Sequence, residues 1–254
     1  TSTGVTAGVF GFLAAHEMIH SADRRERALG LTFLASVFYM HFRVAHIFGH
    51  HRHAATPEDA ATARLGEGLY AFLGRTIPGQ FREAWRSERR RLRRRGRQPL
   101  RPGNRVALYA LIELAIMAAL AFISWRALAF VFGTAAIAVV LLESFNYVAH
   151  YGLTRQSLPG GRYEALGPQH SWNSGRWMNN AALFNMGRHS DHHRKTTRPF
   201  DQLTAVNDQA ELPFGYAGAI LTAFIPPLWR RIMDPRAAAA MGGYLPSEPS
   251  VPVR

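Results

Sequence analysis

The sequence contains no cysteine and only one lysine among its 254 residues. Without cysteine there can be no disulfide bond, no iron–sulfur ligation and no thiolate nucleophile, although the redox compartment stays open. Arginine therefore carries the formal net charge of +13, and residues 82–105 hold eleven arginines against two glutamates. A nucleic-acid-binding protein would spread basic charge over a surface. One basic segment beside apolar runs argues against that class.

Two long apolar runs follow the basic segment. Residues 106–125 are interrupted only by Glu113, and residues 127–142 carry no charge. A helix of about twenty residues crosses the roughly 30 Å hydrocarbon core of a bilayer. The runs predict a transmembrane hairpin over about residues 106–149, within an all-α integral membrane helical bundle. The alternative is a buried hairpin in a soluble all-α domain.

The other segments have weaker signals. We expect a helix over residues 3–20, a helical pattern over 27–51, and a polar loop over 54–105. Within that loop, residues 56–59 form a helix-start signal before the amphipathic residues 65–73. Residues 214–229, which contain Pro226 and Pro227, favour an interfacial or re-entrant helix.

The ends of the chain suggest its domain organisation. The chain opens at Thr1 with no initiator methionine and no signal peptide, inside an apolar stretch too short to span a membrane. We therefore expect a chain that lacks earlier membrane spans. Residues 1–235 would form one membrane-embedded catalytic domain. Residues 236–254, rich in Ala, Pro and Ser, would form a disordered tail.

Nine of the twelve histidines fall into four tight groups along the chain. The groups are His16 and His20; His46, His50 and His51; His150; and His189, His192 and His193. Spacings of three to five residues place rings on one face of a helix, so that they can converge. Nine imidazoles are too many for one tetrahedral zinc and suit two metals. The sequence therefore predicts a dinuclear, nitrogen-rich metal site, with iron, copper, nickel and zinc all open.

Two plainer readings compete with the dinuclear site. The pattern from His16 to His20 matches the H-E-x-x-H motif of zinc proteases, but it leaves seven histidines unexplained. Buried structural histidines would account for His41, His53 or His170 singly, not for three clusters. A site beside a membrane span, in a sequence with no hydrolytic triad or phosphate-binding loop, favours two irons that activate O₂. Glu17 and Asp191 are candidate catalytic residues, as acceptors for histidine ring N–H groups.

Further motifs accompany the histidines. They are residues 55–59 (Ala-Thr-Pro-Glu-Asp), residues 146–147 (Asn-Tyr) with 150–152 (His-Tyr-Gly), residues 170–174 (His-Ser-Trp-Asn-Ser) and residues 188–193 (Arg-His-Ser-Asp-His-His). With these motifs and the histidines, the sequence resembles the integral-membrane, non-haem di-iron alkane 1-monooxygenases over roughly residues 11–235.

The resemblance implies an enzyme that hydroxylates medium-chain alkanes or alkyl groups at the terminal carbon. The reaction is R–CH₃ + O₂ + 2e⁻ + 2H⁺ giving R–CH₂OH + H₂O, and all nine histidines would be ligands of two iron ions. Electrons would come from rubredoxin, reduced by rubredoxin reductase. The protein would be a multi-pass protein of the bacterial inner membrane with its metal site on the cytoplasmic side. Excess arginine beside the spans agrees with a cytoplasmic segment, which could also dock an acidic carrier.

The sequence departs from the family pattern at several positions. Ala45 and Ala149 stand where glutamates usually precede a histidine, and Ser21 replaces a lysine. Residues 184–187 (Phe-Asn-Met-Gly) also differ from the usual segment. An alanine cannot accept a hydrogen bond from an imidazole, so water or a backbone oxygen must do so. A catalytically weakened metal-binding homologue therefore remains an alternative, as does a membrane fatty-acyl desaturase or hydroxylase.

Overall fold

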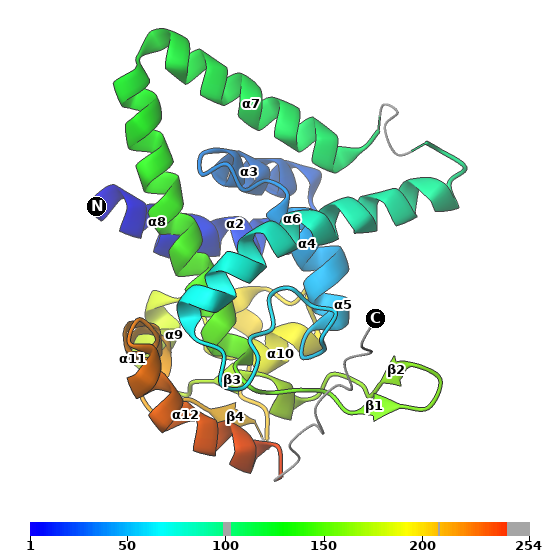
Figure 1. Ribbon diagram of the computed structural model, residues 1–254, viewed down its shortest axis with the longest axis vertical. Helices are drawn as coiled ribbons and strands as arrows, with labels where there is room; N and C mark the ends of the chain where they lie inside the picture. Colours follow the sequence, from blue (N-terminus) through cyan, green and yellow to red (C-terminus); the bar gives the residue numbers. More distant parts are fainter. Residues whose placement is uncertain (99–102, 208, 243–254) are drawn as a thin grey trace, which may run out of the picture.

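Helices form most of the regular structure in the computed structural model, which describes residues 1–98, 103–207 and 209–242 (Figure 1). The all-α prediction is confirmed. The first helical segment matches the expectation for residues 3–20. It runs without a break through α1 (Ser2–Thr6), the π-helical turn η1 (Ala7–Gly11) and α2 (Phe12–His20). After a short turn, α3 (Arg24–Ala35) packs against α2, and the Asp23 side chain caps α3 by accepting from the Arg25 N–H.

The expectation of one helical segment over residues 27–51 is wrong, because the chain turns after Ala35. Phe38 has a φ of 52°, and the Tyr39 N–H closes the turn on the Leu34 carbonyl at 2.9 Å. This is a left-handed helix ending that glycine usually makes, so a phenylalanine gives no sequence signal for it. The chain then continues through α4 (Phe42–Ala45), the π-helical turn η2 (His46–His50) and α5 (His51–His53).

The basic segment is mainly a helix, and the predicted loop is wrong there. Helix α6 runs over Leu69–Arg94 and contains most of the arginines. The predicted helix start at residues 56–59 is also wrong, because that segment forms turns. Arginine is a good helix former. A buried stripe that includes Phe72, Thr76 and Leu92 holds one face of α6 against the body of the protein.

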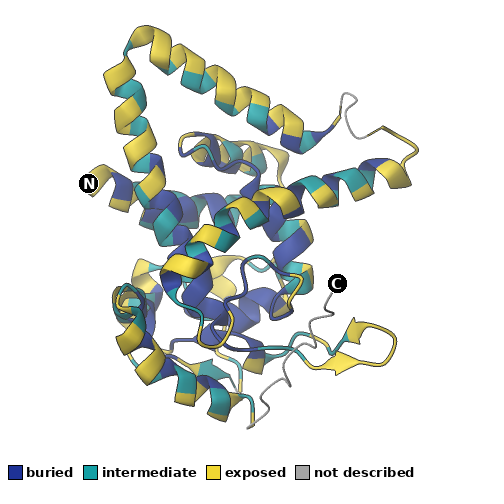
Figure 2. Ribbon diagram, viewed as in Figure 1, coloured by how far each residue is buried: buried dark blue, intermediate teal, exposed yellow. Residues whose placement is uncertain are grey.

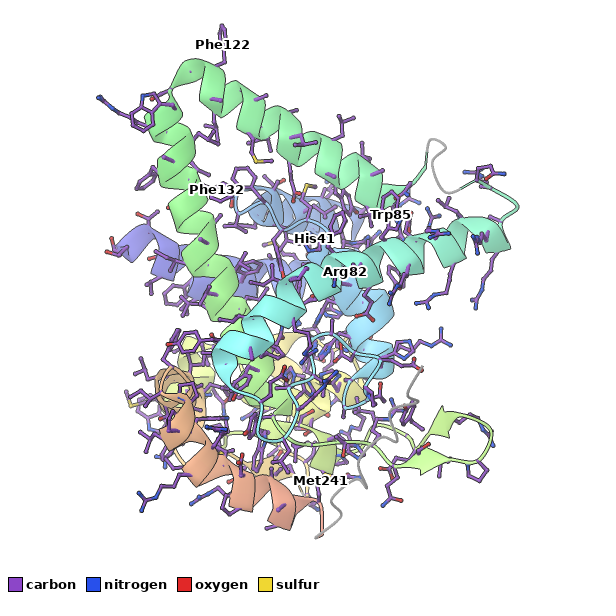
Figure 3. All side chains as sticks on the ribbon, in the orientation of Figure 1. His41, Arg82, Trp85, Phe122, Phe132 and Met241 are labelled. Carbon is purple, nitrogen blue, oxygen red and sulfur yellow. The ribbon has the colours of Figure 1, made fainter. Side chains whose placement is uncertain are left out.

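The predicted hairpin consists of α7 (Arg105–Ile123) and α8 (Trp125–His150), and both are long and apolar enough to cross a membrane. Of the most apolar stretch of 18 residues in α7, only 11% is buried within the structure. Leu111 is 64% exposed and Phe122, at the tip of the hairpin, is 94% exposed (Figures 2 and 3). A buried hairpin of a soluble domain would not expose this surface. The hairpin therefore indicates association with a membrane.

Smaller elements surround the lower end of α8. The strands β1 (Ser157–Leu158) and β2 (Arg162–Tyr163) pair antiparallel, while β3 (Trp172–Asn173) and β4 (Ala210–Glu211) pair in parallel. Short 3₁₀ turns occur at η3 (Pro168–His170) and η4 (Phe200–Gln202). The remaining helices are α9 (Trp177–Ala182), α10 (His189–Arg194), α11 (Gly215–Ala223) and α12 (Pro226–Ala240).

The segment over residues 214–229 is divided between two helices, α11 and α12, which meet before Pro226. Helix α12 continues through Ala240, into the segment that the composition predicts to be a tail. Residues 243–254 of that tail lie outside the described residues.

Helix α8 joins two apolar cores. Its middle, including Ala138 and Leu142, packs with α2, α3 and α4, whereas Tyr147, Val148 and Ala149 pack with α11 and α12. Gly8 allows η1 to approach α8 closely, because a Cβ at this position would lie 2.9 Å from the Ala138 Cα. The histidine-bearing elements meet around the lower half of α8 (Figure 1).

A buried carboxylate joins α6 to the start of α7. Glu88 pairs with Arg91 at 2.5 Å and with Arg105 at 2.8 Å, and it also accepts the Arg105 backbone N–H. Burial alone would raise the pKa of Glu88, but the hydrogen bonds from Arg91 and Arg105 outweigh it and hold this pKa at about 2. The junction therefore needs an ionised carboxylate.

We predict that Glu88→Gln destabilises the fold by about 1–3 kcal/mol, the usual range for hydrogen bonds to charged groups. Because the folded pKa is depressed, the contribution of Glu88 is complete above the unfolded pKa of about 4.3 and is lost as the pH falls toward the folded value. Thermal unfolding in detergent should show a lower midpoint for the variant at pH 7. The control is Glu58→Gln, whose side chain is 58% exposed. Equal midpoints for the two variants would contradict the assignment.

Candidate metal centre

All nine histidines that the sequence groups come together at one place. Their ring nitrogens form two sets, and within each set the potential ligand atoms lie within 4.8 Å of one another. The five-histidine group is His16, His20, His46, His51 and His192. The four-histidine group is His50, His150, His189 and His193. The three other histidines, His41, His53 and His170, belong to neither group.

The Nε2 atoms within each group are close enough to share one centre. In the five-histidine group, His46 Nε2 is 2.8 Å from that of His16 and 2.9 Å from that of His51. In the four-histidine group, the Nε2 atoms of His150, His189 and His193 form a triangle with sides of 3.1–3.2 Å. Ligands about 2.1 Å from one metal and at right angles are about 3.0 Å apart. Hydrogen bonds cannot explain the triangle, because each nitrogen has one lone pair or one proton.

A π-helical turn brings His46 and His51 onto the same face of their helical segment. His46 and His51 are five residues apart, and the expectation that a regular helix places this spacing on one face is wrong, because an α-helix has about 3.6 residues per turn. The turn η2 (His46–His50) widens the helix, so that i and i+5 positions align. Both rings therefore enter the five-histidine group. The predicted convergence of this pair is confirmed, but it depends on a distortion that the spacing alone does not reveal.

Each pair of consecutive histidines is divided between the two groups. His50 and His51 point into different groups, as do His192 and His193. Successive residues on a helix project in directions about 100° apart. The two groups therefore lie side by side, and the ring centroids of His51 and His193, one from each group, are 4.8 Å apart. One short helix can supply both groups at once.

Burial favours the neutral form of most of the imidazoles. His50 is the exception: burial would lower its pKa, but the hydrogen-bonded carboxylate of Asp59 outweighs burial and raises the pKa of this histidine. Desolvation and the neighbouring rings lower the pKa of His51, His192 and His193 well below the usual value, and desolvation lowers that of His20 to about 4. A neutral imidazole offers the lone pair that a metal needs. The Nε2 atoms of His50 and His192 are buried and have no hydrogen-bond partner. Such orphaned nitrogens fit metal binding and would otherwise be costly.

Asp59 is the carboxylate that orients a histidine of the site, a role that the histidine spacing does not predict. His50 Nδ1 donates to Asp59 Oδ2 over 2.8 Å, which leaves His50 Nε2 for a metal. The Thr62 hydroxyl and the Ala61 N–H donate to the same carboxylate. Asp59 ends the motif at residues 55–59, one of the motifs that carry the family resemblance. The sequence predicts a helix start at the same residues, which gives the carboxylate no role at the metal site.

The expected role of Glu17 and Asp191 as acceptors for histidine rings is wrong. Glu17 accepts the Phe200 N–H at 3.0 Å and so ties α2 to η4. Asp191 is buried and accepts from Arg194, Arg198 and the Thr204 N–H. Burial would raise the pKa of Asp191, but these donors hold it below its usual range. With its lone pairs occupied, Asp191 fixes α10 to the chain that follows.

The alanines at positions 45 and 149 lie in apolar surroundings. Ala45 is buried among the residues around α2 and α4, and Ala149 among those around α11 and α12. His150 Nδ1 donates instead to the backbone carbonyl of His170 at 3.1 Å. The expectation that a backbone oxygen replaces the missing carboxylate is confirmed for His150.

The motif at residues 170–174 holds the first turn of α10, the helix that carries His189, His192 and His193. The Asn173 side chain accepts the Ser190 N–H and donates to the Ser190 hydroxyl. Ser190 follows His189 directly, so β3 fixes the first turn of α10. Two motifs that resemble the family pattern thus act together in positioning ligands.

An apolar cavity of about 70 Å³ reaches both histidine groups. His16 and His46 line it from the five-histidine group and His189 from the four-histidine group. Half of the other lining residues are aliphatic or aromatic residues of η1, α2 and α8, namely Val9, Phe12, Leu13, Leu141, Leu142 and Phe145. The cavity is therefore apolar except where the histidines and Asn146 reach it.

We predict that each group holds one metal and can lose it separately. His192→Ala removes a nitrogen from the five-histidine group and His193→Ala one from the four-histidine group. Each variant should keep about one metal per chain after chelator challenge, as measured by elemental analysis. His53→Ala, the matched control outside both groups, should keep the wild-type content. Loss of both metals in either variant would mean that the groups do not bind independently.

A second prediction concerns Asp59. Asp59→Asn keeps the shape of the side chain but removes the charge that orients His50. Loss of such a partner typically lowers metal affinity about 10–100-fold. Competition with a coloured chelator should show this weakening at one site only, while Glu58→Gln leaves both affinities unchanged. Unchanged binding in Asp59→Asn would assign Asp59 a purely structural role.

Comparisons with known proteins agree with the motifs. The sequence matches the fatty acid desaturase family over residues 2–223. It is 42% identical to Alkane 1-monooxygenase 1 of Pseudomonas aeruginosa over 243 residues, which cover 95% of this chain and 64% of that protein. It is 40% identical to the alkane 1-monooxygenase of Pseudomonas putida, covering 96% and 61%, and 27% identical to the xylene/toluene monooxygenase hydroxylase component XylM of the same species, covering 88% and 59%. The chain spans less than two thirds of the length of these relatives. It belongs to the fatty acid desaturase family and is similar to the alkane 1-monooxygenases.

Proposed function

We propose that the chain forms the catalytic region of a membrane alkane 1-monooxygenase. The reaction would be O₂-dependent terminal hydroxylation of a medium-chain alkane or alkyl group to a primary alcohol. One observation carries the proposal: an apolar cavity ends on histidines from both groups. A cavity of this kind would bring a hydrocarbon chain to a metal site, and besides the histidines only Asn146 among its lining residues has a polar side chain.

Two iron ions would occupy the centre, one in the five-histidine group and one in the four-histidine group. When bound, they would supply the redox chemistry that O₂ requires. The residues of the chain hold and orient the site: Asp59 fixes His50, and the carbonyl of His170 fixes His150. The apolar wall excludes water, which protects a reactive centre from side reactions.

The cavity supports reaction at a chain terminus. Val9, Leu13 and His16 all line it and follow one another at helical spacing along one face. A linear chain that lies along this face would meet the histidines with its end. Side chains farther from His16 would then set the longest chain that fits.

The electrons require a separate carrier. The sequence contains no cysteine and so no iron–sulfur site of its own. We propose rubredoxin as the donor, reduced by rubredoxin reductase, because the similar alkane 1-monooxygenases point to this reaction class. The site would lie on the cytoplasmic side of the bacterial inner membrane, in agreement with the arginines beside the hairpin.

A fatty-acyl desaturase or hydroxylase is the second candidate, supported by the family to which the chain belongs. A catalytically weakened homologue is a third, because Ala45 and Ala149 lack carboxylates. Product analysis separates all three.

We expect the iron-loaded protein, supplied with rubredoxin and its reductase, to convert n-alkanes under ¹⁸O₂ into ¹⁸O-labelled primary alcohols. Val9→Phe fills the cavity about two helical turns from His16, so the preferred alkane should become shorter. Val5→Phe is the control: Val5 is 48% exposed and lies outside the cavity wall. Mass spectrometry of the products distinguishes the three candidate functions. Desaturated acyl chains would favour the second candidate, and iron binding without any product the third.

A further inference from the structure

A basic groove lies between η2–α5 and the second half of α6. It has a volume of about 380 Å³ and is lined by Ser87, Ile47 and Phe48 together with six arginines. The arginines are Arg52, Arg90, Arg91, Arg94, Arg95 and Arg105. Arg82 and Trp85, labelled in Figure 3, mark where this half of α6 begins.

The charge of the groove is largely uncompensated. Glu88 neutralises part of it by pairing with Arg91 and Arg105. In the described part of the chain, no carboxylate lies within ion-pair distance of the other four arginines that line the groove. These four arginines are exposed, and the positive charge that they concentrate along the groove attracts anions. Their planar forks match the oxygens of a phosphate.

The position of the groove at the start of α7 favours a membrane lipid as the molecule that carries the phosphate. Arg105 is the first residue of α7, and Leu108 and Leu111 on the next turns are more than half exposed. The Arg105 guanidinium also lies over the ring of Phe48, 4.9 Å from its centroid, and Phe48 is 42% exposed. Arginine and an aromatic ring at the foot of an apolar helix are typical of the membrane interface. A phosphate here would place acyl chains along α7.

We propose that this groove binds the headgroup phosphate of one anionic phospholipid. The inference rests on the proposed membrane location, but not on the reaction. Arg52 and Phe48 belong to the segment that carries His46, His50 and His51. The bound lipid therefore braces the helical segment that supplies three ligands of the metal centre.

The test uses the whole chain in nanodiscs of phosphatidylcholine with increasing phosphatidylglycerol, followed by native mass spectrometry. The groove variant is Arg90→Gln with Arg94→Gln. The matched control is Arg86→Gln with Arg93→Gln, which removes the same charge from the same helix outside the groove. Wild type and control should each retain one phosphatidylglycerol, and the groove variant should bind it at least tenfold more weakly. Metal content, unchanged in both variants, shows that they fold.

Three results would overturn the proposal. Equal loss of lipid in both double variants would mean diffuse attraction without a site. Full displacement of the lipid by millimolar inorganic phosphate would mean that the groove binds a free anion. Groove-dependent binding of an acidic protein, with lipid retention unchanged, would make the groove a protein-docking site. Because the readout is lipid retention, absence of alkane hydroxylation would leave the result intact, whereas failure of the chain to enter nanodiscs would contradict the membrane location itself.

Discussion

Nine imidazoles buried in one interior impose the constraint on which the rest of the structure depends. Burial removes water from the ring nitrogens and lowers the pKa values of His51, His192 and His193, so protons cannot take the place of that water. An unpaired buried nitrogen costs free energy. Two metal ions, one in each histidine group, would accept the lone pairs of these nitrogens and so offset that cost. The fold around the site serves to hold the rings in place against this cost.

Helix α8 connects the site to its surroundings. Its upper part forms an apolar hairpin with α7, its middle packs on η1 and α2, and its last residue, His150, belongs to the four-histidine group. Leu141, Leu142 and Phe145 on the same helix line the apolar cavity. One helix thus links an apolar exposed surface, an apolar cavity and the two histidine groups.

The number of clustered histidines predicted two sites, because nine nitrogens exceed what one metal can bind, but it did not predict which histidine lies in which group. The length of the two apolar runs predicted the α7–α8 hairpin, because each run is long enough to cross a membrane. The other features leave no pattern of residue type or spacing in the sequence. The π-helical turn at residues 46–50, the turn at Phe38 and the contact of Asp59 with His50 have no local signal. Asp191 seemed a plausible ligand support, yet Arg198 and Thr204, which follow it in the chain, occupy its oxygens.

The central claim is that the chain holds two metal ions on imidazole nitrogen. Elemental analysis of the purified wild-type protein, combined with X-ray absorption at the iron edge, tests it most directly. The account predicts about two irons per chain, each surrounded by nitrogen and oxygen with no sulfur in the first shell. One zinc per chain and no iron would contradict it, because a single ion leaves one of the two histidine groups without the ligand that its burial requires.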